Sequence, residues 1–227
     1  MTTLFVIRHG LTGLTGTTLY GRTEGIALDH RGQAQARALA ERFAAIRLTA
    51  IYSSPLERCR QTVEPLAAAQ RLRVTERPGL IEMDAGSWTG KPLGRLRRTK
   101  AWAEVQRSPS TFRFPGGGES FSEAWDRVGT DVDAIARRHP RGRVAIATHG
   151  DIARLLLGSY LGAPLDAFQR IVIDTASVSV VQLRSGARPH VLLMNESGGL
   201  DRFGPDGATP PWEEPAPRQR SGKNLRG

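Results

Sequence analysis

Cysteine and long apolar runs are scarce in this chain of 227 residues, and each scarcity excludes a class of protein. A single cysteine, Cys59, excludes an internal disulfide framework and a cysteine-based metal site. No apolar run approaches the roughly 18 residues that a transmembrane helix needs. The apolar segment near the N-terminus covers only residues 4–7 and follows no basic residues, so we predict no signal peptide and a cytoplasmic protein.

The charge balance is strongly basic, with a formal net charge of +10. Such a charge attracts anions, which include phosphorylated metabolites, nucleic acid and acidic membrane surfaces, although an arginine-rich surface without a function would give the same balance. The basic residues from Arg218 onward are not interleaved with aromatic residues, as they are in single-strand binders. We therefore expect no nucleic-acid partner and no membrane partner.

Short apolar runs alternate with longer amphipathic segments along most of the chain. The runs predict strands at residues 4–7, 50–53, 73–76 and 144–147, followed by closing strands at 177–183 and 189–194. The amphipathic segments predict helices at residues 29–46, 55–70, 92–106, 119–139 and 151–161. Alternating strands and helices indicate an α/β fold, in which a mostly parallel sheet is flanked by helices in three layers.

The character of the chain changes near Asp201. Five prolines follow that residue, and the apolar periodicity stops. We expect residues 1–200 to form one domain and residues 201–227 to form a disordered, Pro-rich basic tail.

Two predicted strands end in the same dipeptide, His9-Gly10 and His149-Gly150. A third strand leads into a predicted helix that carries Arg58. Because ligands of open α/β sheets bind past the carboxyl ends of the strands, these side chains are expected to converge at one edge. A single histidine at a strand end is more often a packing or capping residue, but the repeated dipeptide favours a functional site.

The segment Arg8-His9-Gly10, followed by Thr12, resembles the opening signature of the histidine phosphatase superfamily, the phosphoglycerate mutase-like enzymes. Later segments resemble that family's further blocks in the same order: Ser53-Ser54-Pro55-Leu56-Glu57-Arg58-Cys59-Arg60-Gln61-Thr62, Leu80-Ile81-Glu82-Met83-Asp84-Ala85-Gly86-Ser87-Trp88-Thr89-Gly90 and Thr148-His149-Gly150-Asp151. Because the blocks occur in order over residues 4–195, the chain is identified as a member. The resemblance implies a phosphoglycerate mutase-like fold with a helical insertion near the active site.

The resemblance assigns catalytic roles to His9, Glu82, Arg8, Arg58 and His149. A neutral imidazole, with a pKa near 6.5, is a good nucleophile toward phosphorus, and a phosphohistidine on His9 would split one displacement into two. The guanidinium groups of Arg8 and Arg58 can each donate hydrogen bonds to two phosphate oxygens at once. His149 would add a further hydrogen-bond donor beside a helix N-terminus. We expect a backbone carbonyl to hold the second ring nitrogen of His9.

Glu82 is predicted to protonate the leaving alkoxide and then to take a proton from water in the second step. That role requires a pKa raised above about 4.3 by burial or by neighbouring anions. Asp84 is the alternative acid.

Thr15, Gly21, Arg22 and Gly150 complete the predicted phosphate-binding set, again by resemblance. Thr15 stands where many members have Asn, but its hydroxyl can still donate one hydrogen bond. Arg22 is either a substrate contact or a solvent-exposed loop residue. Ser120 follows a run of glycines and either donates to substrate or begins a helix.

We predict a metal-independent phosphomonoester hydrolase, without a cofactor, that acts on a small phosphorylated metabolite and releases inorganic phosphate. The alternatives are a phosphoglycerate mutase-type phosphomutase that uses the same histidine, or a silent phosphate-binding module. The second is suggested by Thr15 and by Leu11, which stands where many members have Glu or Gln. The mutases of the family carry a longer insertion after the block that contains Glu82. In this chain only a short basic stretch separates that block from the segment that begins at Gly116, which resembles the phosphatase branch. The basic segment 91–100 favours a substrate with further negative charge, and the terminal strands could pair in a homodimer.

Overall fold

A central sheet with strand order β4-β3-β6-β1-β7-β8 organises the computed structural model, which describes residues 1–184 and 186–197. The strands are β1 (Thr2–Arg8), β3 (Ala50–Ser53), β4 (Val74–Glu76), β6 (Arg143–Thr148), β7 (Val178–Leu183) and β8 (His190–Glu196). The pairings from β4 to β1 are all parallel, whereas β7 is antiparallel to both of its neighbours. The expected mostly parallel sheet is confirmed, while the predicted tail at 201–227 lies outside the described residues.

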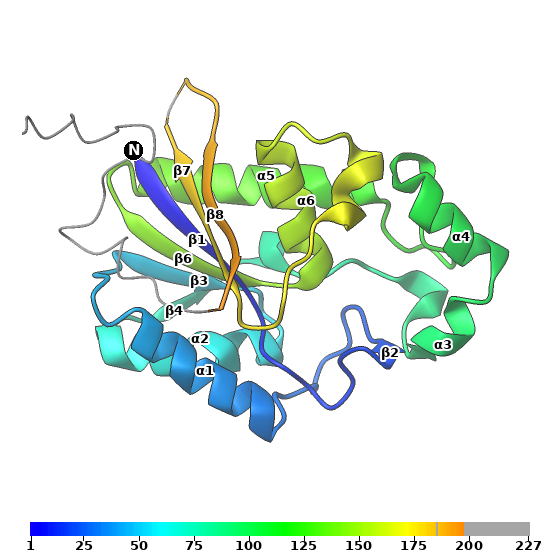
Figure 1. Cartoon of the computed structure of the whole chain (residues 1–227), viewed down its shortest axis with the longest axis horizontal. Helices are drawn as coiled ribbons and strands as arrows, with labels where there is room; N and C mark the ends of the chain where they lie inside the picture. Colours follow the sequence, from blue (N-terminus) through cyan, green and yellow to red (C-terminus); the bar gives the residue numbers. More distant parts are fainter. Residues whose placement is uncertain (185, 198–227) are drawn as a thin grey trace, which may run out of the picture.

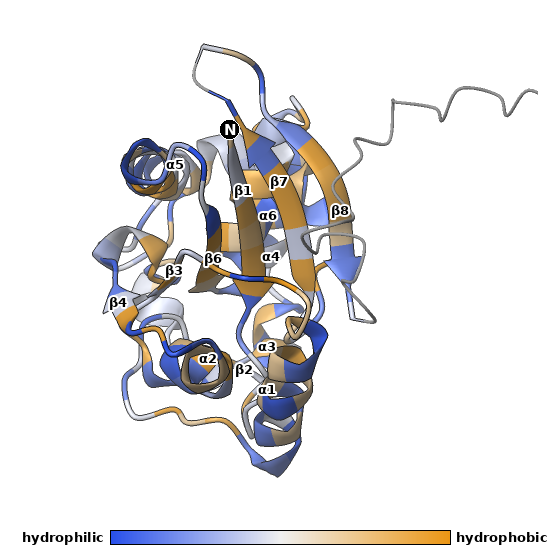
Figure 2. Ribbon diagram, turned by 90° about the vertical axis from the view of Figure 1, so that its left-hand side faces the viewer, coloured by the Kyte–Doolittle hydropathy of each residue, from blue (hydrophilic) through white to orange (hydrophobic). Residues whose placement is uncertain are grey.

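Helices cover both faces of this sheet and complete the three predicted layers (Figure 1). The helices α1 (His30–Arg42) and α2 (Glu57–Gln70) pack on one face, and α5 (Phe121–Arg138) and α6 (Gly150–Tyr160) pack on the other. Because successive strand side chains point to opposite faces, Phe5 and Ile7 join the core under α1 and α2, whereas Leu4 and Val6 join the core under α5 and α6. Figure 2 accordingly shows mostly hydrophobic residues along the central strands, whereas the helices carry both hydrophobic and hydrophilic residues.

The helix expected at residues 29–46 begins as predicted but ends early. Asp29 is its N-cap, with a carboxylate that accepts from the backbone N–H groups of Arg31 and Gly32. The helix ends at Arg42, although Phe43 and Ile46 are still fully buried in the core. The apolar spacing therefore continues past the end of the helix, which explains why the pattern overestimated its length.

The single helix predicted at residues 92–106 is wrong in detail, because the segment forms α3 (Leu93–Leu96) and α4 (Lys100–Arg107). The hydroxyl of Thr99 donates to the carbonyl of Leu96 at 2.7 Å and accepts the N–H of Trp102 at 3.1 Å, so this residue ends one helix and begins the next. A two-stranded ribbon of β2 (Thr18–Leu19) and β5 (Lys91–Pro92) joins this insertion to the loop after β1. The ribbon was not predicted, since two residues carry no periodicity.

Ser120 begins α5 rather than facing a ligand cavity. Its hydroxyl accepts the N–H of Glu123, and the Glu123 carboxylate accepts the N–H of Ser120 in return, which is a capping box. None of the helices in the described part of the chain is long and apolar enough to span a bilayer.

Candidate functional site

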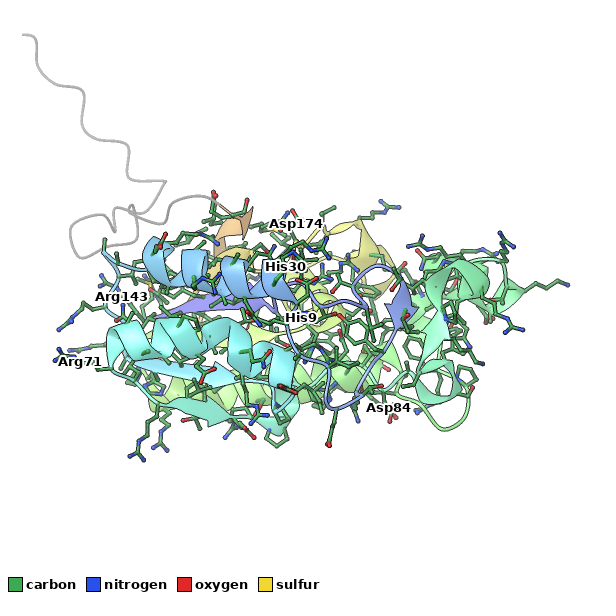
Figure 3. The ribbon with its side chains drawn as sticks, turned by 90° about the horizontal axis from the view of Figure 1, so that it is seen from below. His9, His30, Arg71, Asp84, Arg143 and Asp174 are labelled. Carbon is green, nitrogen blue, oxygen red and sulfur yellow. The ribbon has the colours of Figure 1, made fainter. Side chains whose placement is uncertain are left out.

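The carboxyl ends of three neighbouring strands, β3, β6 and β1, bring the predicted histidines together. Arg8 of β1 pairs in register with Thr148 of β6, so His9 and His149 follow at the same level. The centroids of the two imidazole rings are 5.3 Å apart. Figure 3 shows His9 at the centre of the molecule, between the α1–α2 pair and the insertion that holds α3 and α4.

His9 is buried and held in one tautomer. Its Nδ1 lies 2.8 Å from the carbonyl oxygen of Gly10, which can only accept, so the ring proton is on Nδ1 and the Nε2 lone pair is free. Burial, and then the charges of Arg58 and Arg8, lower the pKa of His9 to about 3. The imidazole is therefore neutral at physiological pH, and its backbone partner is the carbonyl that we expected.

Arg58 lies on α2 with no exposed surface. Its two Nη groups donate to the carbonyls of Gly21, at 2.7 Å, and Thr23, at 3.2 Å. Its Cζ also lies 4.8 Å from the centre of the Tyr20 ring, a cation–π contact. Gly21 has a φ of 44°, a conformation that glycine adopts readily, and this turns its carbonyl toward the guanidinium.

Arg8 approaches the site from β1, and its Nη1 donates to the carbonyl of Ile173 at 2.6 Å. A Cβ at Gly150 would lie 3.3 Å from the Nε of Arg8, so a residue without a side chain permits this close approach. The Nε–H groups of Arg8 and Arg58 are both buried and find no acceptor among the described residues. An unsatisfied buried donor costs about 1–3 kcal/mol, so an anionic oxygen beside these groups would be stabilised.

His149 is fully buried, and its Nε2 lies 2.8 Å from the hydroxyl of Ser54. We assign the hydroxyl as the donor, because a carboxyl oxygen of Glu82 lies on the Nδ1 side of the ring and can accept a proton there. This assignment leaves the ring proton on Nδ1, the nitrogen that faces Glu82 at 3.9 Å. Burial, followed by the charge of Arg58, lowers the pKa of His149 well below its usual value, so the ring is a neutral donor.

Cys59 packs against this histidine, with its Sγ 3.4 Å from Nε2 of His149. Burial raises the pKa of the thiol above its ordinary value. The residue is therefore a buried packing group and not a thiolate nucleophile.

Glu82 meets the requirement for a proton donor at neutral pH. Burial, and next the negative charge of Asp151, raise its pKa to about 7 against the opposing hydrogen bond from the N–H of Met83. Asp84, the alternative acid, has a side chain that is 43% exposed and faces Arg22. Figure 3 shows Asp84 near the edge of the molecule, well apart from His9.

A cavity of about 450 Å³ opens over these groups. Of the predicted residues, six line it: Arg8, His9, Thr15, Gly21, Glu82 and Gly150. Arg58 and His149 are buried beside it. The hydroxyl of Thr15 accepts the N–H of Thr12 at 3.0 Å, so it also shapes its own loop.

The structure does not bring Arg22 into the lining of this cavity. Its Nε donates to the backbone carbonyl of Glu82 at 2.9 Å, and its Nη2 pairs with Glu119 at 3.0 Å. Arg22 is neither a free loop residue nor, in this arrangement, a group that faces the phosphate. It holds the backbone of the segment that carries Glu82.

The sequence reasoning did not single out five of the lining residues: Tyr20, Trp102, Gln106, Arg154 and Gln169. Arg97, which also lines the cavity, belongs to the basic segment 91–100 that the sequence associated with a negatively charged substrate. Arg154 could have been found from its spacing of four residues after Gly150, which places both on one face of α6. Ser54 was missed as a partner of His149, because only the folded sheet places β3 beside β6. Within the described residues no cluster of three or more His, Cys, Asp or Glu side chains could hold a metal ion.

Comparisons with known proteins agree with this geometry. The sequence model of the histidine phosphatase superfamily (branch 1) matches residues 4–197. The chain is 29% identical to phosphoserine phosphatase 1 of Hydrogenobacter thermophilus over 211 residues, which cover 89% of this chain and 96% of the relative. It is 33% identical to a metal-independent phosphoserine phosphatase of Arabidopsis thaliana over 191 residues, 81% of this chain and 77% of that one. The solved structure of Bacillus stearothermophilus YhfR matches with a TM-score of 0.80 at 27% identity, covering 86% of this chain and 98% of that chain.

Proposed function

Because the chain belongs to the histidine phosphatase superfamily and is a phosphatase of small metabolites, we propose that it works through a phosphohistidine formed on His9. The observation that carries the proposal is a neutral imidazole with a free Nε2, beside two guanidiniums whose buried Nε–H groups have no acceptor among the described residues. This combination suits nucleophilic attack on a group whose negative charge must be stabilised.

In the first step, the Nε2 of His9 attacks phosphorus and the bond to the ester oxygen breaks. The leaving oxygen takes the proton of Glu82, whose raised pKa of about 7 keeps it protonated below neutral pH. In the second step, the Glu82 carboxylate takes a proton from a water molecule, which attacks the phosphohistidine, and inorganic phosphate leaves as the P–N bond breaks. Arg8, Arg58 and the Nδ1–H of His149 stabilise the equatorial oxygens in both steps.

Release of inorganic phosphate tests the proposed function directly. We expect the purified protein to hydrolyse p-nitrophenyl phosphate and phosphoserine, the substrate named in two relatives, and to keep this activity in EDTA. Phosphorus NMR with 3-phosphoglycerate would separate the alternatives. Isomerisation without phosphate release would indicate a mutase, and tight phosphate binding without turnover would indicate a silent binding module.

Replacement of Asp151 by Asn is expected to shift the upper limb of the pH–activity profile to lower pH. The Asp151 carboxylate disfavours the ionised form of Glu82, so removing that charge lowers the pKa of the acid below about 7. Activity that requires protonated Glu82 is then lost at a lower pH. The measurement is kcat/KM against pH for the wild type, for D151N and for D126N, an exposed control on α5. An unchanged upper limb in D151N would contradict the assigned cause.

A further inference from the structure

We infer that Glu119 is a positioning residue for the reaction, because its carboxylate holds Arg127 and Arg22 against the backbone that carries Glu82. The inference rests on the proposed function, since it takes Glu82 to be the proton donor. We call Glu119, Arg127 and Arg22 together the clamp, and none of these three side chains lines the catalytic cavity. The clamp therefore acts on the reaction through Glu82 and not by touching the substrate.

The described residues on either side of Glu82 form no strand or regular α-helix. Residues 81–85 lie between two short 3₁₀ turns, Pro78–Leu80 and Gly86–Trp88. Within the described part of the chain, the carboxyl group of Glu82 makes one hydrogen bond, in which it accepts the N–H of its neighbour Met83 at 2.9 Å. The position of this carboxyl group therefore depends on what holds the surrounding backbone.

Arg127, on α5, donates along this backbone. Its Nη1 lies 2.7 Å from the carbonyl oxygen of Gly79 and 2.9 Å from that of Ile81, and its Nη2 lies 3.5 Å from that of Glu82. A planar guanidinium presents several donors in a rigid fork, so it can hold several acceptors from one position, which an ammonium group does not do. Arg127 therefore fixes the backbone immediately before the acid.

Two further donors complete this pattern. The Nε of Arg22 donates to the carbonyl of Glu82 at 2.9 Å, and the hydroxyl of Thr148 donates to the carbonyl of Leu80 at 2.7 Å. Each backbone carbonyl from residue 79 to residue 82 thus accepts from a side chain that comes from another part of the fold. These hydrogen bonds take the place of the ladder that a strand would supply.

Glu119 holds both guanidiniums in position. Its Oε1 accepts the Nε–H of Arg127 at 2.9 Å, while its Oε2 accepts from Nη2 of Arg127 at 2.9 Å and from Nη2 of Arg22 at 3.0 Å. The side chain of Glu119 is only 11% exposed, so water weakens these charge-assisted hydrogen bonds little. Its backbone N–H also donates to the carbonyl of Asp84 at 2.9 Å. One carboxylate therefore fixes two arginines and, through them, the acid.

Arg22 also links the acid to the phosphoryl end of the site. The preceding residue, Gly21, accepts from Arg58 at 2.7 Å through its carbonyl. A Cβ at Gly21 would lie 3.3 Å from the carbonyl oxygen of Met83, so the two segments are in contact. Adjacent residues of one loop thus bind the guanidinium of Arg58 and the backbone of the acid. The clamp thereby sets the position of Glu82 relative to the group that Arg58 binds.

A double-mutant cycle tests the inference. For an alkyl phosphate such as phosphoserine, we expect kcat to fall about 10–100-fold in R127M and in E119Q, the scale of a misplaced catalytic group, while KM changes less than about twofold. For p-nitrophenyl phosphate, whose leaving group is stable without a proton, the loss should be smaller. In the E82Q background, R127M and E119Q should each cost less than about threefold, because the group through which they act is already gone.

A conservative variant and a matched control separate positioning from charge. R127K keeps the positive charge without the planar fork, so its kcat for phosphoserine should stay within about threefold of that of R127M. R60M removes an arginine that pairs with Glu76 at 3.2 Å and does not line the cavity, so it should match the wild type on both esters. Should R127M not fold, R22M replaces it, because it removes the contact with Glu82 and leaves Arg127 paired with Glu119.

Hydrogen exchange gives a readout that needs no turnover. In R127M and E119Q the amides of residues 79–85 should exchange faster, while those of β1 and β6 keep their protection, because the clamp holds that segment and not the sheet. Unchanged exchange in the segment, equal losses of kcat on both esters, or a full further loss in the E82Q background would overturn the inference. If the wild type hydrolyses no ester, the proposed function fails, and the exchange rates alone decide whether the clamp holds this backbone.

Discussion

Replacement of His9 by Ala should lower kcat for a small phosphate ester by on the order of 10⁵-fold, the scale found when a catalytic nucleophile is removed. Among the described residues, no second nucleophile lies at this position. The Nε2 of His149 is hydrogen-bonded to Ser54, and burial raises the pKa of the Cys59 thiol, which therefore stays protonated. A phosphoprotein that is labile in acid and stable in base should be trapped by rapid quenching of the wild type and be absent from H9A.

Two controls separate this loss from misfolding. His9 is only 2% exposed, so the alanine leaves a small cavity and frees the carbonyl of Gly10. Thermal unfolding of H9A should therefore be measured beside that of the wild type, and H9Q gives a second variant that fills the space. H30A is the matched histidine control, because His30 is the exposed first residue of α1 (Figure 3) and should retain full activity. Residual activity of a few per cent in H9A would contradict the nucleophile assignment.

Replacement of Glu82 by Gln should lower kcat/KM for an alkyl phosphate by about 10²–10⁴-fold, the usual contribution of a general acid. The loss should be smaller for p-nitrophenyl phosphate, because nitrophenolate is stable without a proton. Equal losses on both esters would show that Glu82 binds or positions the substrate and does not protonate it. D84N tests the alternative acid and should lose far less, since Asp84 is half-exposed and paired with Arg22.

The pH profile gives an independent reading of the same carboxyl group. Its pKa is raised to about 7, so the protonated and active form dominates below that pH and is lost as the pH rises through it. His9, with a pKa lowered to about 3, is already neutral over this range. Activity of the wild type should therefore be highest between these values and fall above neutrality. E82Q should lack the fall near pH 7, whereas ionisation of the substrate affects both proteins alike.

Much of the fold could be predicted because buried strands are continuous apolar runs that stop at polar residues. The strand at 50–53 agrees with β3 at both ends, and the carboxyl ends of β1 and β6 carry His9 and His149 as expected. The insertion was less predictable. Its break at Thr99 depends on two local hydrogen bonds, and the β2–β5 ribbon depends on contact between segments about 70 residues apart.

The candidate site likewise has features that the sequence predicted and features that it could not predict. The sequence predicted His9 and the need for a carbonyl at its Nδ1, because a neutral histidine nucleophile must have one fixed tautomer. It left open whether Arg22 contacts substrate, and the structure shows a contact with the backbone of Glu82 that no local pattern could indicate. Ser54 was invisible as a functional residue, because its contact with His149 depends on a neighbouring strand of the folded sheet.

By itself, the sequence determined which groups meet at the sheet edge, since the order of strands and the residues that end them are written in local patterns. Only the tertiary structure decided the protonation states of these groups. A pKa depends on how far water is excluded and on which charges lie within a few ångströms, so the low pKa of His9 and the raised pKa of Glu82 exist only once Arg8, Arg58 and Asp151 are packed around them.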